Sequence, residues 1–417
     1  MNQARTTQTR DTTTLTQSET TCRDESDLKT VSFRKRPTAA LGQDIRTKRW
    51  LESTDTHAHE NGQKGPRLHT IVDADGKGPS LVVVETEAGP SSFLTRVLTL
   101  SVLHYSTFAG SILALALGWI LLFLPQSWGI KMAVLFGLAV YASSYYDRAE
   151  YKGGRRSRKL LNSWSFWEHP MAWNEMEVIR TAKLDPQQKY VFAIYPHGIA
   201  ALSRYFLTSP YFQLLFPDIK QPLQLATSLL FRIPLARELC LAMGYIDASR
   251  KSAAYALTRG ENLSVYPGGV AEALAEGLTN DPRQLQIVRR EGFVRLALEH
   301  DAHLVPVAVL GETRTYSCFP FPKAWVHGVY NVLKAPLQFA FGYAGSFIPK
   351  PVPITVVFGK PIALPRIPEP TKEQVKQYAD IYFSEYSKLV QAYRHKLGNQ
   401  TDVKLCMMDT STAYEKV

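Results

Sequence analysis

The chain has 417 residues, of which 45% are hydrophobic, and it carries a formal net charge of +11. This length predicts one large domain with accessory segments. A basic protein attracts nucleic acid, anionic membrane or anionic substrates. The sequence shows no zinc-ligand spacing and no recognisable nucleic-acid motif. We therefore expect no metal and no nucleic-acid partner, and we favour phospholipid and a phosphate-bearing cosubstrate.

The four cysteines, Cys22, Cys240, Cys318 and Cys406, are far apart in the sequence. They form neither a metal-binding nor a redox pattern and do not indicate a disulfide framework. The simplest interpretation is a reducing environment that faces the cytosol. The polar N-terminus shows no cleavable signal peptide.

The two ends of the chain are predicted to be tails. Residues 1–90 are rich in Thr, Ser, Gln and charge, and apolar residues are sparse before Leu81-Val82-Val83-Val84. Such a segment buries too little apolar surface to offset its ordering entropy. We expect a mostly disordered N-terminal tail over 1–90 and a C-terminal tail over 399–417.

A membrane hairpin is predicted over 97–147. No charged residue occurs in 102–124, a length that fits a bilayer-spanning helix. Residues 125–129 break the run, and 132–146 is a second, shorter apolar run. Basic residues flank the pair, which places both flanks in the cytosol by the positive-inside rule. The segment is expected to cross twice or to enter and return. A buried pair of core helices is the alternative.

Residues 148–398 alternate between strand-like and helical segments, which predicts an α/β domain. The strands are expected at 190–194, 244–247, 261–266, 304–310 and 354–359. The helices are expected at 250–257, with Ser249 as the N-cap, at 292–300, and from a capped start at 370–374.

Two glycine loops after strands carry the candidate chemistry. The first is Tyr195-Pro196-His197-Gly198, which places an imidazole where a strand ends. Imidazole is the side chain best suited to proton transfer near neutral pH. The second loop is Pro267-Gly268-Gly269-Val270-Ala271-Glu272, which adds one carboxylate. Alone, each residue is more often a turn cap or a solvated helix residue. Together, beside a membrane segment, they indicate a lipid-modifying enzyme.

The ordered motifs resemble the type 2 diacylglycerol acyltransferase family, whose relatives include monoacylglycerol acyltransferases and wax synthases. The resemblance covers the hairpin and nearly all of the domain that follows. Its motifs are Gly153-Gly154-Arg155-Arg156-Ser157, Tyr195-Pro196-His197-Gly198, Phe231-Arg232-Ile233-Pro234, Ser249-Arg250, Pro267 to Glu272, Arg290 to Leu298, Leu304-Val305-Pro306-Val307, Gly311-Glu312 and Val357 to Ile362.

The resemblance implies an acyl-CoA:diacylglycerol O-acyltransferase that forms triacylglycerol. It implies an enzyme of the endoplasmic reticulum membrane and of lipid droplets, with a cytosolic catalytic domain. Acyl-CoA is then a cosubstrate, and no other cofactor is expected. The family usually has His or Glu where this chain has Tyr195. That departure puts a second base at this position in doubt.

We expect His197 to act as the general base and Glu272 to orient its imidazole, as carboxylates do in hydrolase triads. Backbone amides near Gly198 or Gly268-Gly269 are candidate oxyanion donors. Tyr195 and Pro196 complete the predicted substrate-binding residues. The phosphates of acyl-CoA are expected to meet one or more of three arginines, although most arginines are simply solvated. These arginines are Arg232, Arg250 and Arg290.

Several alternatives stay open. A monoacylglycerol acyltransferase or a wax synthase fits the same motifs, because pocket shape decides the acceptor. A non-catalytic lipid-droplet hairpin protein would explain 97–147 but not the two glycine loops. A glycerol-phosphate acyltransferase with Asp four residues after the His is disfavoured, because Ala201 occupies that position. The sequence also leaves open whether the protein is a monomer or a homo-oligomer.

Overall fold

The structure is a computed structural model, and the chain divides into two units, Met1–Arg36 and Pro37–Val417. Every element below belongs to the second unit. The described residues are 67–71, 81–85, 97–98, 100–101, 116–119, 121, 128–153, 164–279, 284–319, 322, 340–397 and 404–409.

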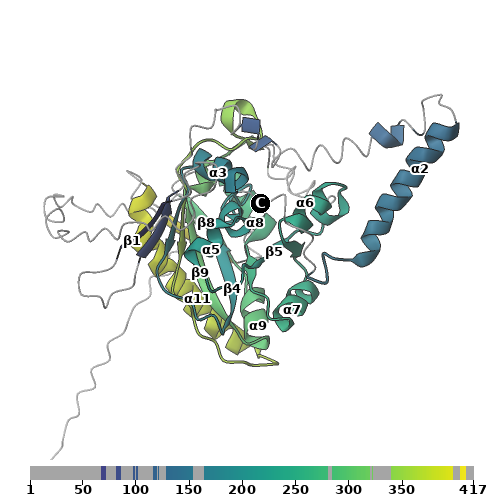
Figure 1. Ribbon diagram of the computed structural model, residues 1–417. Helices are drawn as coiled ribbons and strands as arrows, with labels where there is room; N and C mark the ends of the chain where they lie inside the picture. Colours follow the sequence, from purple (N-terminus) through teal and green to yellow (C-terminus); the bar gives the residue numbers. More distant parts are fainter. Residues whose placement is uncertain are drawn as a thin grey trace, which may run out of the picture. The chain divides into compact units, whose positions relative to one another are not determined.

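The described elements alternate between strand and helix along most of the chain (Figure 1). The strands are β1 (Arg67–Ile71), β2 (Leu81–Glu85), β3 (Glu177–Arg180), β4 (Lys189–Tyr195), β5 (Leu223–Ala226), β6 (Tyr245–Asp247), β7 (Leu263–Val265), β8 (Gln284–Arg289), β9 (Ala302–Leu310), β10 (Ser317–Cys318), β11 (Ala340–Phe341), β12 (Thr355–Phe358) and β13 (Lys404–Asp409). The helices are α2 (Trp128–Ser143), α3 (Trp164–Trp173), α4 (Arg204–Thr208), α5 (Tyr211–Leu215), α6 (Ala236–Ala242), α7 (Arg250–Thr258), α8 (Gly269–Thr279), α9 (Gly292–Glu299) and α11 (Lys372–Tyr393), with 3-10 turns η1 (Ser144–Asp147), η2 (Leu230–Arg232), η3 (Glu312–Arg314), η4 (Tyr343–Gly345) and η5 (Arg394–Leu397).

A nine-stranded sheet has the order β1-β2-β3-β12-β9-β4-β7-β5-β6. Strand β4 lies between β9 and β7 and runs parallel to both. Strands β7, β5 and β6 continue the parallel pairing, whereas β12 is antiparallel to β9. The carboxyl ends of β9, β4 and β7 therefore lie at the same edge of the sheet, so the segments that follow these strands are brought together.

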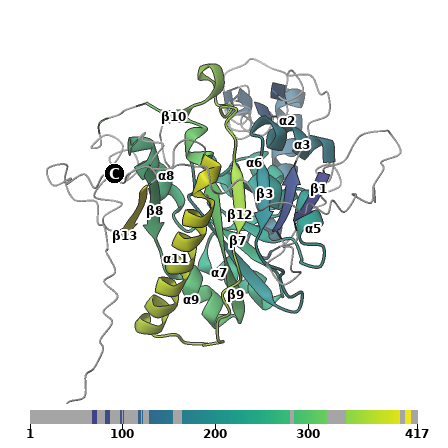
Figure 2. The same ribbon diagram turned by 90° about the vertical axis from the view of Figure 1, so that its left-hand side faces the viewer.

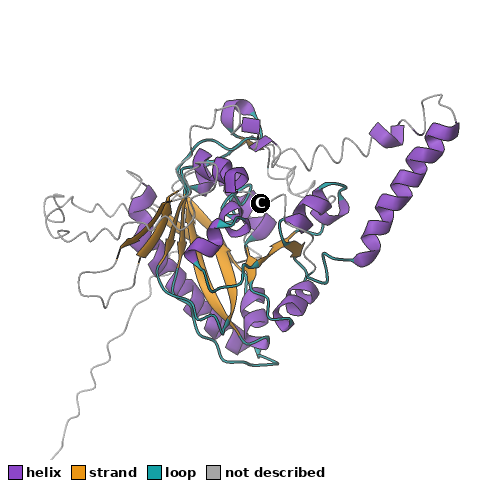
Figure 3. Ribbon diagram, in the orientation of Figure 1, coloured by secondary structure: helices purple, strands orange, loops and turns teal. Residues whose placement is uncertain are grey.

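Helices cover both faces of the sheet (Figure 3). Side chains alternate along a strand, so Phe192 and Ile194 of β4 pack with α3, α4, α5 and α6. Val191, Ala193 and Tyr195 pack on the other face with α7, α9 and α11. Figure 2 shows α11 lying along that face. Because both faces are buried, β4 and β9 are continuous apolar runs. The predicted α/β class is confirmed.

Local signals placed the helix starts correctly. Ser249 caps α7 by accepting a hydrogen bond from the Ser252 amide. Thr371 and Gln374 form a reciprocal capping box at the start of α11.

Short strands lie within both predicted tails. Within 1–90, the strands β1 and β2 pair with each other, and β2 pairs with β3. The β-branched run in β2 explains this, since such residues favour strands. Within 399–417, β13 pairs in parallel with β8 and buries Cys406 and Met408. The remaining residues of both tails lie outside the described ranges.

Helix α2 begins inside the predicted break of the hairpin and ends before the predicted end of the second apolar run. None of its side chains is buried, and Trp128 and Phe136 are 82% and 71% exposed. Most of the first apolar run, 102–124, lies outside the described residues. Among the helices that are described, none has both the length and the apolar character required to cross a membrane.

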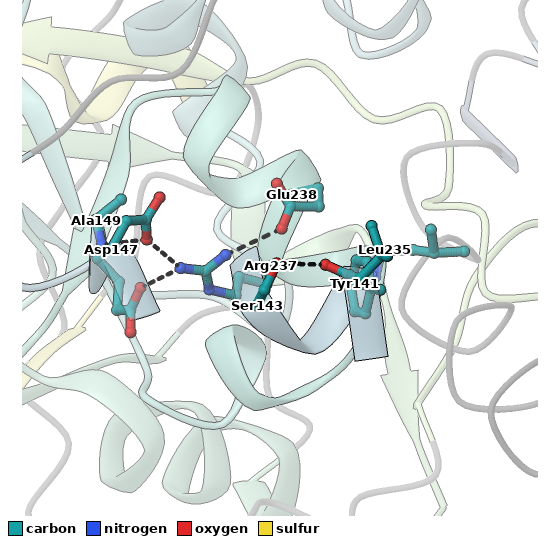
Figure 4. Close-up of polar contacts among 9 residues, drawn as sticks. Tyr141, Ser143, Asp147, Ala149, Leu235, Arg237 and Glu238 are labelled. Carbon is teal, nitrogen blue, oxygen red and sulfur yellow. Dashed lines mark hydrogen bonds and ion pairs between the residues drawn. The ribbon is translucent and has the colours of Figure 1, made fainter. Parts of the chain in front are cut away.

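Arg237 in α6 joins the end of the α2 region to the domain (Figure 4). Its guanidinium is fully buried and pairs with Asp147 at 2.9 Å, Glu150 at 2.8 Å and Glu238 at 3.0 Å. It also lies 4.4 Å from the centre of the Tyr145 ring. Burying a charge costs several kcal/mol unless partners satisfy it. The three carboxylates supply those partners, so this cluster fixes the segment after α2 against α6.

Candidate functional site

The loop after β4 carries His197 at the carboxyl edge of the sheet. Its neighbours at this edge are the segments that follow β7 and β9. The β7 segment leads into α8 and contributes Glu272, and the β9 segment leads into η3 and contributes Glu312. The exposed fractions of these two side chains are 0% and 1%. The site is thus an imidazole loop between two buried carboxylates.

The His197 ring is fixed by its own loop. Nδ1 lies 2.7 Å from the carbonyl oxygen of Gly198. A carbonyl oxygen only accepts, so Nδ1 carries the proton and donates, and the lone pair of the neutral ring is on Nε2. The ring also meets Tyr266 edge to face, with centroids 5.4 Å apart. This orientation gives His197 the tautomer that a general base requires.

His197 keeps part of its surface exposed, yet its ring is closely surrounded by protein. Desolvation by burial lowers the pKa of His197 to about 4. The hydrogen bond to Gly198 opposes this shift, and the positive charge of Arg204 adds to it. The imidazole is consequently neutral near pH 7, and the same desolvation makes it a weaker proton acceptor than an exposed imidazole.

Glu272 holds the backbone of the His197 loop. Its Oε1 accepts a hydrogen bond from the His197 amide, and its Oε2 accepts one from the Val288 amide at 3.0 Å. The sequence predicted a contact with the imidazole instead. Burial raises the pKa of Glu272 to about 8, against these two hydrogen bonds and the charge of Arg290.

The predicted glycines lie tightly against the carboxylates. A Cβ on Gly268 would lie 2.0 Å from Oε2 of Glu272, and a Cβ on Gly198 would lie 2.9 Å from Cγ of Glu312. Gly198 and Gly269 also have φ values of +62° and +56°, which favour glycine. The Gly269 amide donates to the Tyr266 carbonyl at 3.1 Å, so that amide belongs to the turn.

Tyr195 points away from the His197 loop. Its ring is buried against Tyr382, Phe383 and Tyr386 of α11, and its hydroxyl donates to the Val288 carbonyl at 3.3 Å. Strand alternation explains this direction, because Tyr195 shares a face with Ala193. In this structure Tyr195 is a core residue, and Pro196, also buried, follows it through a cis peptide bond.

The three predicted arginines are not all at this edge. Arg232 is exposed and follows β5, which ends at the His197 edge. Arg290 follows β8, and its positive charge lowers the pKa of Glu272. Arg250 instead pairs with Glu299 at 2.6 Å, beside the amino end of β9.

The separation of Arg250 from His197 follows from the strands. His300, next to Glu299, accepts a hydrogen bond from Lys189, the first residue of β4. Strand β4 has seven residues, so its ends are about 20 Å apart. Arg250 lines a polar cavity of about 540 Å³ with Arg295 and His300 at this opposite end. The structure therefore does not bring Arg250 to His197.

The sequence reasoning assigned no role to Glu312, Ser203, Arg204 or Tyr266. Ser203 Oγ and the Tyr266 hydroxyl are 2.8 Å apart. The Arg204 guanidinium lies 4.4 Å from the Tyr266 ring centre and donates to the Leu225 carbonyl at 2.9 Å. Glu312 follows a strand and a glycine, as Glu272 does, and that pattern could have identified it. Among the described residues, no cluster of His, Cys, Asp or Glu could hold a metal.

Comparison with known proteins identifies the family of the chain. The family model described as diacylglycerol acyltransferase matches residues 120–408. That match includes both glycine loops and the segment with Glu312.

Three relatives show the range of the family. 2-Acylglycerol O-acyltransferase 1 of Bos taurus is 33% identical over 272 residues, covering 61% of this chain and 80% of that protein. Acyl-CoA wax alcohol acyltransferase 1 of Homo sapiens is 32% identical, covering 61% of this chain and 81% of that protein. Diacylglycerol O-acyltransferase 2 of Xenopus laevis is 32% identical, covering 60% of this chain and 72% of that protein. Because the family model matches most of the chain and the relatives are aligned over most of their own length, the chain belongs to the diacylglycerol acyltransferase family and is an O-acyltransferase.

Proposed function

We propose that the chain transfers an acyl group from acyl-CoA to the hydroxyl of diacylglycerol and forms triacylglycerol, with His197 as the general base. The observation that carries this proposal is the neutral imidazole whose Nδ1 proton is held by Gly198, leaving Nε2 to accept a proton. The matched family and the Xenopus laevis relative favour diacylglycerol as the acceptor.

The chemistry needs one proton relay. Nε2 of His197 takes the hydroxyl proton while the acceptor oxygen attacks the thioester carbonyl. The carbon–sulfur bond then breaks, and the thiolate of CoA takes the proton from the imidazolium. Because a thioester is already activated, the acceptor attacks it directly. We assign stabilisation of the tetrahedral oxyanion to the amides of Gly198 and Gly268.

Positive charge at the His197 edge of the sheet supports acyl-CoA as the acyl donor. The phosphates of CoA need positive partners. Of the predicted arginines, Arg232 follows β5 to this edge, and Arg290 acts electrostatically on Glu272. We assign phosphate contacts to Arg232 and Arg290, and we leave Arg250 out because it lies at the opposite end of β4.

Two other acceptors, monoacylglycerol and fatty alcohol, are named among the relatives and use the same chemistry. The purified protein, supplied with acyl-CoA and a panel of diacylglycerol, monoacylglycerol and fatty alcohol, decides between them. We expect the highest kcat/KM with diacylglycerol. We also expect His197→Ala to lose roughly 10²- to 10⁴-fold in kcat, the usual contribution of a general base. A preference for another acceptor would correct the substrate, and a folded, fully active His197→Ala would contradict the assigned base.

Helix α2 supports a membrane location. Its apolar side chains lie on all sides and are exposed, a pattern typical of a helix surrounded by lipid. Its 16 residues extend about 24 Å, less than the hydrocarbon core of about 30 Å. We propose that α2 forms one arm of a hairpin embedded in the endoplasmic reticulum membrane, with the catalytic domain in the cytosol. A partly inserted arm is also compatible with a lipid-droplet monolayer.

Single cysteines at residues 60, 127 and 400, in a chain without its native cysteines, test this topology. In sealed microsomes we expect an impermeant thiol reagent to label 60 and 400. Protection of 127 from both sides indicates a hairpin held within the membrane, and labelling of 127 only from the lumen indicates two full crossings. If 400 were protected while 60 reacted, the cytosolic placement of the domain would be wrong.

The raised pKa of Glu272 gives a pH-dependent stability. In the folded protein its pKa is about 8, above the ordinary value of 4.5. The folded state therefore binds a proton that the unfolded state releases, and this contribution is lost as pH rises from about 5 towards 8. Glu272→Gln removes the titrating group. We expect its unfolding temperature to fall less than that of the wild type over this range.

Glu373→Gln is the matched control, because Glu373 lies at the exposed start of α11. Glu312 also titrates in this range, with a pKa of about 7, so the unfolding temperature of the Glu272 variant still falls in part as pH rises. If the unfolding temperature fell equally with rising pH in the wild type and in Glu272→Gln, burial would not hold the proton on Glu272.

A further inference from the structure

A glycine turn directs Glu312 into the protein after β9. Gly311 has φ of +94°, and a Cβ there would lie 2.2 Å from the Pro353 carbonyl oxygen. Only glycine fits this turn without displacing backbone. The turn places the Glu312 side chain in the interior, where it is 1% exposed.

Glu312 contacts the His197 loop at three points. Its Oε1 accepts a hydrogen bond from the Leu202 amide, and its Oε2 accepts one from the Ser203 amide at 3.3 Å. Its Cγ lies against Gly198, where a Cβ would approach to 2.9 Å. Each carboxylate oxygen therefore holds one amide of the loop, and the stem of the side chain supports the glycine next to the imidazole.

Gly198 connects Glu312 to the imidazole. The Gly198 carbonyl accepts the Nδ1 proton of His197, which fixes the direction of the ring. A shift of Gly198 would turn this carbonyl and release the ring. We propose that Glu312 is a positioning residue for the acyl transfer: by holding Gly198, Leu202 and Ser203, it keeps the His197 imidazole in its reactive orientation.

The topology gives the two carboxylates matching places. Strands β7 and β9 lie on either side of β4. The segment after β7 supplies Glu272, which holds the loop at the His197 amide, and the segment after β9 supplies Glu312, which holds it at Leu202 and Ser203. The base is therefore fixed from both sides of its strand.

The carboxylate of Glu312 satisfies two loop amides at the cost of burying an ionisable group. Burial raises the pKa of Glu312 to about 7, against hydrogen bonds from Ser203 and Leu202 and the charge of Arg204. A raised pKa means that the fold disfavours the charged form. An apolar side chain would avoid this cost but would leave the two loop amides without their acceptor.

Glu312→Gln and Glu312→Leu test the proposal. Glutamine keeps one acceptor but turns an NH₂ group towards one loop amide, and leucine removes both acceptors. We expect kcat to fall about 10-fold in the glutamine variant and roughly 10²-fold in the leucine variant, the loss typical of a misplaced catalytic group. The KM for acyl-CoA should change little, because Glu312 holds the base rather than the donor.

Glu150→Gln is the matched control, since Glu150 is also a buried glutamate but belongs to the Arg237 cluster. It should lower the unfolding temperature and keep kcat. An equal loss of kcat in Glu150→Gln, or an unchanged kcat in Glu312→Gln, would overturn the positioning role. If the leucine variant does not fold, the glutamine variant decides.

The inference rests on the proposed role of His197 as the base, and its failure can be told apart from failure of that proposal. A wild type that transfers no acyl group to any acceptor in the panel would overturn the proposed function. An active wild type that loses activity in His197→Ala but not in Glu312→Gln would overturn only the role of Glu312.

Discussion

Hydrogen bonds from loop amides to two buried carboxylates fix the site. Glu272 accepts a hydrogen bond from the amide of His197, and Glu312 accepts hydrogen bonds from the amides of Leu202 and Ser203. Among the residues that the structure describes, neither carboxylate hydrogen-bonds the imidazole, and the ring is instead held by the carbonyl of Gly198. In the proposed mechanism, reactivity is thus set indirectly, because the carboxylates fix the loop backbone and the backbone fixes the His197 imidazole.

The sheet makes this arrangement. Parallel pairing of β9, β4 and β7 brings three carboxyl ends to one edge, although the residues after them are far apart in sequence. Strand alternation directs Tyr195 into the α11 face, and because β4 ends at Tyr195, His197 in the following loop lies outside that core. The Arg237 cluster then fixes the segment after α2 to the domain that carries the site. In the proposed membrane setting, this cluster joins the membrane arm to the catalytic domain.

Much of the fold could be predicted from the sequence, because its signals are local. The continuous apolar runs of β4 and β9 and the caps at Ser249 and Thr371 each involve neighbouring residues. Strand β13 was missed because its partner, β8, is remote in sequence and its pairing leaves no local mark.

The sequence predicted candidate residues for the site but not their contacts. His197 and the glycine loops follow from the strand-loop pattern. Whether Glu272 meets a side chain or an amide depends on how β4 and β7 pair, which no local pattern gives. The motif of Arg250 does not say at which end of the sheet its guanidinium lies, and the structure pairs it with Glu299. Glu312 carried a usable signal, a glycine and an acid directly after a buried strand.

Hydrogen–deuterium exchange of the peptide over 196–203 tests most directly whether the carboxylates hold the loop. In the wild type we expect slow exchange at His197, Leu202 and Ser203, because each amide donates to a buried carboxylate. Glu272→Gln should speed exchange at His197, and Glu312→Gln should speed it at Leu202 and Ser203. Exchange in the wild type as fast as in an unstructured peptide would contradict the account.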